Sequence, residues 1–324
     1  MEKKQPLLAV VGPTASGKTS LSIRLAHILG GEIVSADSMQ MYRGMNIGTA
    51  KPTREEMEGI PHHLMDILDP NQTFSVADYA ALARPLILEI GERGKLPILT
   101  GGTGLYVSAI TDYIQFSPMP SDPALREDLH RKAAQEGNGA VFALLRECDP
   151  ETAASLHENN LGRVIRAIEV YRLTGIPMSE HIRRSRAVPP PYNTCILGLT
   201  YRDRQKLYDR INLRVDKMLE AGLLEEARKV LGGELSHTAS QAIGYKELRG
   251  FLEGWETLPE AVERLKKESR NYAKRQLTWF RRDASIHWLE ADTFSDEDAL
   301  LKAALEIVRD ELCLSAPQGQ GENS

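Results

Sequence analysis

Apolar and polar residues along the first hundred positions follow two different periods. Short runs rich in Val, Leu and Ile cover 7–11, 33–37 and 96–100, as expected for buried parallel strands. Between these runs, apolar residues recur at helical spacing just after the first run and over 75–90, where Pro85 predicts a kink. Strand, helix, strand, helix, strand is typical of a parallel α/β sheet.

Prolines divide the rest of the chain into segments. They cluster at 118–123 and again at 189–191, and the pattern between these clusters is helical. Asp122-Pro123 and Asp149-Pro150 each combine an N-cap acid with a proline suited to the first turn of a helix. We therefore expect a small all-helical domain at 121–188.

The segments on either side of this helical stretch are expected to form one core. Apolar runs at 194–199 and 285–289 predict that the chain returns to the sheet after the helical domain. The predicted core thus comprises 1–120 and 189–314. The polar end of the chain, 315–324, is expected to be disordered.

A phosphate-binding motif lies directly between the first strand and the first helix. Its residues match G-x-x-x-x-G-K-[ST], the P-loop, in the strand–loop–helix context that this motif requires. They are Gly12, Pro13, Thr14, Ala15, Ser16, Gly17, Lys18 and Thr19. The loop N–H groups and the helix N-terminus favour a phosphate chain, Lys18 adds positive charge, and the Thr19 hydroxyl can hold Mg²⁺. The predicted fold class is therefore α/β, with a P-loop NTPase-like parallel sheet core and an inserted small all-helical domain.

Composition excludes several classes of protein. The three cysteines are far apart in the sequence, which fits neither a disulfide framework nor a zinc site. No apolar run is long enough to span a membrane, and a core strand follows the N-terminus almost at once, so no signal peptide is expected. We expect a cytoplasmic protein without a membrane partner.

Basic residues are concentrated in one stretch of an otherwise acidic chain. The net charge is −5, yet 261–282 contains eight Lys or Arg residues with three aromatic residues interleaved. These aromatic residues are Tyr272, Trp279 and Phe280. The stretch is either a solvated helix face or a footprint for a nucleic-acid backbone with stacking aromatics.

Asp37 ends the second predicted strand. The carboxyl ends of parallel strands share one sheet edge, where ligands bind, so we expect Asp37 at the same edge as the P-loop. It could be a Mg²⁺ ligand, a general base or a helix N-cap. The polar and flat residues that follow it, Ser38, Met39 and Gln40, suit the reading of a base edge. Thr103 reaches this edge in a glycine loop, whereas His62 and His63 are interpreted as structural.

A series of motifs resembles the tRNA dimethylallyltransferase (tRNA isopentenyltransferase) family over about residues 6–289. Besides the P-loop, they cover 37–42, 47–52, 59–64, 101–106, 241–246 and 274–280, in the same order as in the family. Each motif after the P-loop is weak alone, but seven in order are highly specific. Two positions depart from the family pattern. Asn46 stands where the family has Asp, and Leu161-Gly162 stand where the family has Pro and a long polar residue. A C-terminal zinc finger, found in eukaryotic members, is not expected.

The resemblance implies transfer of a dimethylallyl group from dimethylallyl diphosphate to N6 of adenosine 37, beside a tRNA anticodon. It implies that the P-loop binds the diphosphate, that Thr19 holds Mg²⁺, and that Asp37, Lys18, Thr19 and Thr103 are catalytic. Arg214, which ends a basic stretch that begins at Arg202, is expected to reach the diphosphate as well. The implied tRNA contacts are Asp37, Ser38, Met39, Gln40, Thr103, Arg126, Arg163, Arg166, Gln241, Lys246, Lys274, Arg275, Arg281 and Arg282. A monomer without an obligate protein partner is expected.

Two other classes of function remain open at this point. A small-molecule or nucleoside kinase using ATP fits the P-loop and Asp37 equally well, but does not account for the basic aromatic stretch. A non-catalytic RNA-binding or GTPase-type switch protein would need a guanine-reading Asn/Thr-Lys-x-Asp element, which the sequence lacks.

Overall fold

The computed structural model describes residues 4–117 and 119–314, and the chain divides into two compact units. The first combines the chain up to Thr111 with the chain from Pro191 onward, and the second is Asp112–Pro190. The expected boundaries were 121 and 188. The second unit is longer at both ends, and within it the Gln115 N–H donates to the Ser185 carbonyl at 2.7 Å. The expected disordered tail, 315–324, lies outside the described residues.

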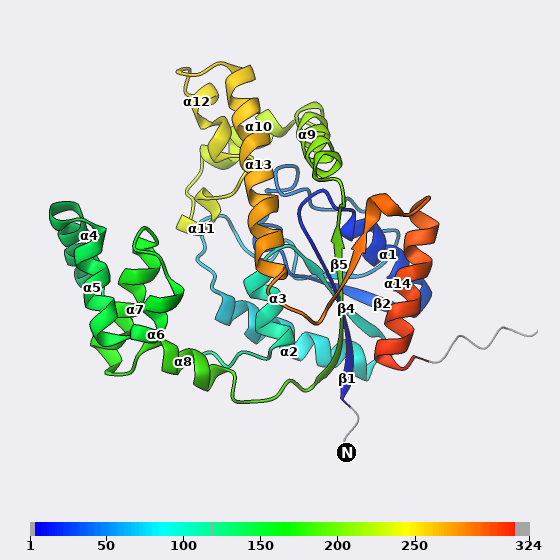
Figure 1. Ribbon diagram of the computed structural model, residues 1–324. Coiled ribbons are helices and arrows are strands. Elements are labelled where there is room, and N and C mark those ends of the chain that lie inside the picture. The colour runs from blue at the N-terminus through cyan, green and yellow to red at the C-terminus, as the bar shows by residue number, and fades with distance from the viewer. Residues whose placement is uncertain (1–3, 118, 315–324) are drawn as a thin grey trace, which may run out of the picture. The chain divides into compact units, whose positions relative to one another are not determined.

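Within the described residues, the first unit contains one six-stranded sheet, and every paired strand is parallel. The strand order is β3-β2-β4-β1-β5-β6, which confirms the predicted parallel α/β fold (Figure 1). The strands are β1 (Gln5–Val11), β2 (Gly31–Ser35), β3 (His62–His63), β4 (Leu96–Gly101), β5 (Tyr192–Thr200) and β6 (Ile286–Glu290). Only β3, a two-residue edge strand paired with β2, was not predicted.

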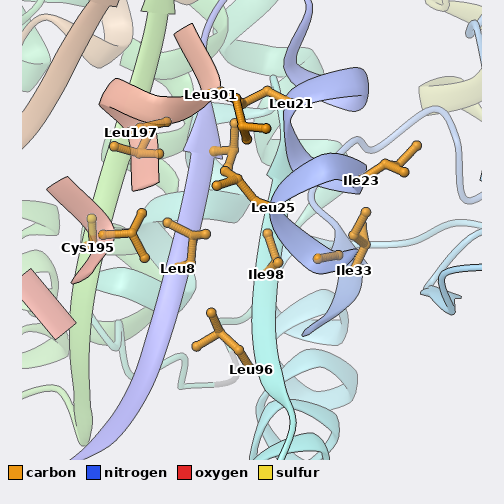
Figure 2. Close-up of a cluster of buried hydrophobic side chains, with 14 of the residues drawn as sticks. Leu8, Leu21, Ile23, Leu25, Ile33, Leu96, Ile98, Cys195, Leu197 and Leu301 are labelled. Carbon is orange, nitrogen blue, oxygen red and sulfur yellow. The ribbon is translucent and has the colours of Figure 1, made fainter. Parts of the chain in front are cut away.

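Helices cover both faces of this sheet. On one face, α1 (Lys18–Leu29) and α14 (Glu297–Leu312) pack against the strands, and on the other lie α2 (Val76–Glu92) and α3 (Gly104–Thr111). Figure 2 shows side chains from α1, α14 and strands of the sheet in one apolar cluster, which includes Leu8, Leu25, Ile98, Leu197 and Leu301. Burying each of these side chains stabilises the fold by roughly 1.5–3 kcal/mol. Since this core holds β1 and α1 together, it fixes the loop between them.

The remaining helices of this unit follow β5. They are α9 (Arg204–Glu220), α10 (Leu223–Leu231), α11 (His237–Ser240), α12 (Arg249–Leu252) and α13 (Leu258–Phe280), with short 3₁₀ turns at Lys246–Leu248 and Ala291–Thr293. Thr257 and Glu260 form a capping box that begins α13. Leu207, Ile211 and Ala273 pack α9 against α13, and α13 also contacts α3. The long basic helix therefore lies beside the carboxyl edge of the sheet.

The described residues of the second unit form helices joined by loops, and none of them belongs to a strand. Its helices are α4 (Pro123–Glu136), α5 (Asn138–Cys148), α6 (Pro150–Ser155), α7 (Leu161–Thr174) and α8 (Met178–Ser185). Asp122 accepts from the Ala124 and Leu125 N–H groups, and Asp149 accepts from the Thr152 N–H. Both predicted N-caps are thus confirmed.

A buried carboxylate in α7 binds two of the arginines that were expected to contact tRNA. Glu169, which is fully buried, accepts two hydrogen bonds from Arg126 at 2.9 Å, one from Arg166, and one from the Asp122 N–H at 2.7 Å. Burial raises the pKa of Glu169, but the hydrogen bonds from Arg126 and its other donors lower it to about 2. Arg126 and Arg166 therefore neutralise this carboxylate inside the helical unit, whereas Arg163 is exposed.

No helix among the described residues has the length and apolarity that a membrane span requires.

Candidate active site

The first unit contains a cavity of about 510 Å³ at the carboxyl edge of the sheet. Its walls come from the P-loop, the segment after β2, the turns around 48–52, helices α9 and α13, and the segment 237–246. The cavity brings together eleven of the residues singled out from the sequence: Thr14, Lys18, Thr19, Asp37, Ser38, Met39, Gln40, Arg214, Gln241, Lys246 and Arg275.

Other residues singled out from the sequence lie elsewhere. Thr103 is one hydrogen bond away from the cavity wall, through Ser38. Lys274, in α13, and Arg281 and Arg282, directly after it, are exposed and do not line the cavity. Arg126, Arg163 and Arg166 belong to the second, helical unit of the chain.

The P-loop requires glycine at its first position because the backbone there is tightly packed. Gly12 has a φ of 141°, and a Cβ at this position would lie 2.5 Å from the Leu199 carbonyl oxygen. Gly17 has a φ of 97° and precedes Lys18, the first residue of α1. Lys18 Nζ donates to the Pro13 carbonyl at 2.7 Å, which keeps the ammonium group beside the loop.

Two cations and one carboxylate face each other across this part of the cavity. Burial and the charge of Arg214 lower the pKa of Lys18 to about 7, and the attraction of Asp37 opposes that shift. Burial likewise lowers the pKa of Arg214, against the attraction of Asp37 and Glu56. Because Lys18 and Arg214, called the cation pair below, repel each other in a partly desolvated site, the site favours an anion with several charges.

Asp37 is held in a defined orientation by the segment that contains it. Its Oδ1 accepts from the Met39 N–H at 3.0 Å, and the Ser38 N–H donates to Thr103 Oγ1 at 3.0 Å. Gln40 continues this network by donating to the carbonyls of Thr49 and Ala50. The Met39 N–H thus fixes Oδ1 of Asp37 within the turn.

The inner face of α13 contributes Gln276, a residue that was not predicted to belong to the site. Gln276 is buried; its Oε1 accepts from the Thr14 N–H at 2.9 Å, and its Nε2 donates to the Gly102 carbonyl at 3.0 Å. It therefore joins the P-loop to the glycine loop that carries Thr103. Gln276 lies within the motif at 274–280, but its role could not be predicted, because a single glutamine in a basic helix is indistinguishable from a surface residue.

His62 also lines the cavity, although it was interpreted as structural. Its Nδ1 lies 2.8 Å from the Ile60 carbonyl, and its buried Nε2 has no hydrogen-bond partner among the described residues. Burial lowers the pKa of His62, which favours a neutral ring with Nε2 as an acceptor. His63, by contrast, binds Glu32 at 2.8 Å on the far side of the same edge strand, together with Arg93.

The basic residues of α13 and of the two positions that follow it fall into two groups. Arg264 pairs with Glu256, Lys266 with Asp216, and Arg270 with the Asn212 amide. The exposed group has no ion pair within the described residues, and it consists of the four predicted phosphate contacts, Lys274, Arg275, Arg281 and Arg282, together with Lys267. In the exposed group, Arg275 lies 5.7 Å from the Tyr272 ring and Arg282 lies 6.0 Å from the Trp279 ring. Unpaired charge beside aromatic rings is the combination that single-stranded nucleic acid binds.

The family model of the IPP transferases matches residues 40–283 of this chain, which is well over half of its length. A second family model, isopentenyl transferase, matches residues 5–71. The chain belongs to the IPP transferase family. This IPP transferase is 50% identical over 311 residues to the tRNA dimethylallyltransferase of Bacillus velezensis. The match covers 96% of this chain and 98% of that protein.

Solved structures agree with this assignment. One similar crystal structure is that of the full-length tRNA isopentenylpyrophosphate transferase from Bacillus halodurans. Its sequence is 47% identical to that of this IPP transferase, the TM-score is 0.70, and the match covers 95% of this chain and 98% of that one. A eukaryotic dimethylallyltransferase acting on tRNA is 28% identical, with a TM-score of 0.81, covering 95% and 80%. The kinase and GTPase-type alternatives are therefore not favoured.

Proposed function

We propose that this IPP transferase moves a dimethylallyl group from dimethylallyl diphosphate to N6 of adenosine 37, beside the anticodon of a tRNA. The observation that carries the proposal is a single cavity in which the cation pair, Asp37 and apolar helix side chains face one another. The relatives, which are named as tRNA dimethylallyltransferases, support the same reaction.

The diphosphate is the leaving group, and the P-loop end of the cavity is suited to hold it. Residues 12–19 supply loop N–H groups and the N-terminus of α1, which favour phosphate oxygens. Lys18 and Arg214 add charge where the leaving group becomes more negative, so they stabilise the transition state more than the bound substrate. The allylic carbon can then develop cationic character.

We assign Mg²⁺ to Thr19 at this end of the cavity. The Thr19 hydroxyl lines the wall, and an oxygen ligand of this kind suits Mg²⁺ together with the oxygens of a diphosphate. When bound, the ion would neutralise charge on the leaving diphosphate. The residues present therefore fit the cation that the P-loop motif implies.

Asp37 is proposed as the general base. The exocyclic amine of adenine is a weak nucleophile because its lone pair is delocalised into the ring. A carboxylate that accepts a hydrogen bond from N6–H takes the proton as the C–N bond forms. Thr103, which accepts from the Ser38 N–H, keeps the segment carrying Asp37 in place, and the exposed Gln241 and Lys246 are proposed RNA contacts on the same cavity.

The target base must leave the anticodon stack to reach this cavity, and loops of RNA allow such exposure. We propose that the exposed group binds the RNA backbone and that Arg163, the exposed member of the three predicted arginines of the helical unit, adds a contact, whereas Arg126 and Arg166 are held by Glu169. A cytoplasmic, monomeric enzyme that needs no other protein fits this reaction, because both substrates are soluble.

Neutralising two residues of the exposed group, Lys274 in α13 and Arg282 just after it, tests the RNA contacts. Lys274→Gln with Arg282→Gln is expected to weaken RNA binding and to lower the slope of log K against log salt by about 0.7–0.9 for each phosphate that the protein no longer neutralises. The measurement is anticodon stem-loop affinity over a salt series. As a matched control, Arg228→Gln with Arg249→Gln neutralises two residues that are paired with Glu225 and Glu253. An unchanged slope in the Lys274→Gln, Arg282→Gln variant would show that these residues face solvent and do not contact the RNA.

The decisive experiment for the function is to incubate the protein with dimethylallyl diphosphate and an anticodon stem-loop, and then to weigh the RNA. The expected result is a mass gain of one dimethylallyl group in place of one hydrogen, absent from a stem-loop that lacks adenosine at position 37. Thermal stabilisation by ATP, without any gain in RNA mass, would instead indicate a kinase.

A further inference from the structure

Glu226, on α10, binds two separate parts of the cavity wall without lining the cavity itself. Its carboxylate accepts the backbone N–H groups of Asn46, Ile47 and Gly48 at 3.0, 2.9 and 2.9 Å. It also accepts the hydroxyl of Tyr245 at 2.8 Å. A carboxylate with four donors is firmly fixed, since hydrogen bonds to a charged group are the strong ones.

The two parts of the wall that Glu226 joins are in direct contact. A Cβ at Gly48 would lie 2.6 Å from Tyr245 Cζ, and a Cβ at Gly244 would lie 3.3 Å from the Gly48 Cα. Gly48, Thr49 and Ala50 line the cavity from one segment, and 241–244 line it from the other. The position of Glu226 therefore determines how closely these segments approach each other.

These segments border the apolar part of the cavity. Met39, Val215, Met218, Ile243 and Leu265 line the cavity and also belong to the hydrophobic cluster that packs around Tyr245 and Met45. A displacement of 46–48 or of Tyr245 would change the space available beside these side chains. Interiors are close-packed, so such a change alters what the cavity accepts.

We propose that Glu226 is a positioning residue that limits the length of the prenyl group, by holding the wall segments 46–50 and 241–245 together. This inference rests on the proposed function. Dimethylallyl diphosphate has a five-carbon chain, and geranyl diphosphate has the same reactive end with five more carbons. The wall as Glu226 holds it admits the short chain and excludes the longer one.

The test compares the two diphosphates as substrates for transfer to an anticodon stem-loop. In Glu226→Gln, one acceptor oxygen remains and an NH₂ donor faces the backbone donors, so the wall loosens. We expect kcat/KM for dimethylallyl diphosphate to fall roughly 10-fold and the ratio of geranyl to dimethylallyl transfer to rise roughly 10-fold, within the range of pocket discrimination. Tyr245→Phe, which removes one of the four donors, should raise the ratio less.

Glu225→Gln is the matched control, because it removes the same charge from the neighbouring residue of α10, which is exposed and pairs with Arg228. It should leave the ratio unchanged. Glu226→Asp keeps the charge and should fall between the wild-type enzyme and Glu226→Gln, which keeps the test valid if the Gln variant fails to fold.

Parallel losses for both diphosphates in folded variants, with an unchanged ratio, would overturn the positioning role and leave only a structural one. A wild-type enzyme that transfers no dimethylallyl group would overturn the proposed function, and this inference with it. A wild-type enzyme that accepts both diphosphates equally would overturn the length limit alone.

Discussion

Asp37→Asn is expected to lower single-turnover transfer by about 10²–10⁴-fold, which is the usual contribution of a positioned general base. Asparagine has nearly the same size, and its Oδ1 can still accept from the Met39 N–H that fixes the turn. Diphosphate and stem-loop affinities should therefore survive. The amide cannot take the N6 proton, so the defect should lie in the chemical step.

A Mg²⁺ series separates this role from that of a metal ligand. If Asp37 acted mainly by holding the ion, high Mg²⁺ would restore much of the rate in Asp37→Asn, and the general-base assignment would be wrong. A rate that stays low across the series supports the base. Asp209→Asn, at an exposed position on α9, is a suitable control for the loss of one carboxylate.

Lys18→Ala is expected to reduce transfer by at least about 10²-fold, the scale for removing one group that stabilises a developing anion. Lys18 faces the diphosphate end of the cavity, so stem-loop affinity should be nearly unchanged. The measurements are single-turnover transfer and stem-loop binding. A folded variant that loses RNA affinity would show that Lys18 has a different role. Lys206→Ala removes an exposed charge from α9 as the control.

The pH dependence of diphosphate binding gives an independent check on Lys18. Burial and Arg214 lower its pKa to about 7 in the free protein, so the side chain loses its charge as the pH rises through that value. A bound polyanion favours the charged form and raises the pKa again. Diphosphate affinity should therefore fall above about pH 7, and binding there should take up a proton. Calorimetry in buffers of different ionisation enthalpy should detect this uptake in the wild-type protein and not in Lys18→Ala.

Local signals explain why much of the fold was predictable. The five longer strands are continuous apolar runs, the two N-caps are proline-flanked acids, and the P-loop is a contiguous motif. Each of these features is specified by residues within a few positions of one another. The edge strand β3 has only two residues, which is too short for a periodic pattern to reveal.

The residues that hold the site together could not be found in the same way. Gln276 binds Thr14 from 262 positions away, and Glu226 binds Ile47 from 179 positions away. A glutamine or glutamate in a charged helix resembles a solvated residue, because only the tertiary fold shows what the side chain meets. The opposite error arises for Arg126, which looks like a free surface cation in the sequence. Its partner Glu169 becomes apparent only when α4 and α7 pack together.

The cation pair has a consequence for the end of the catalytic cycle. Lys18 and Arg214 attract the diphosphate most strongly once it has separated from the prenyl group, when its charge is greatest. The groups that accelerate bond cleavage therefore also retain the product. Inorganic diphosphate should compete with the prenyl donor, and repeated turnover should be limited by product release, so that steady-state rates report on dissociation more than on chemistry.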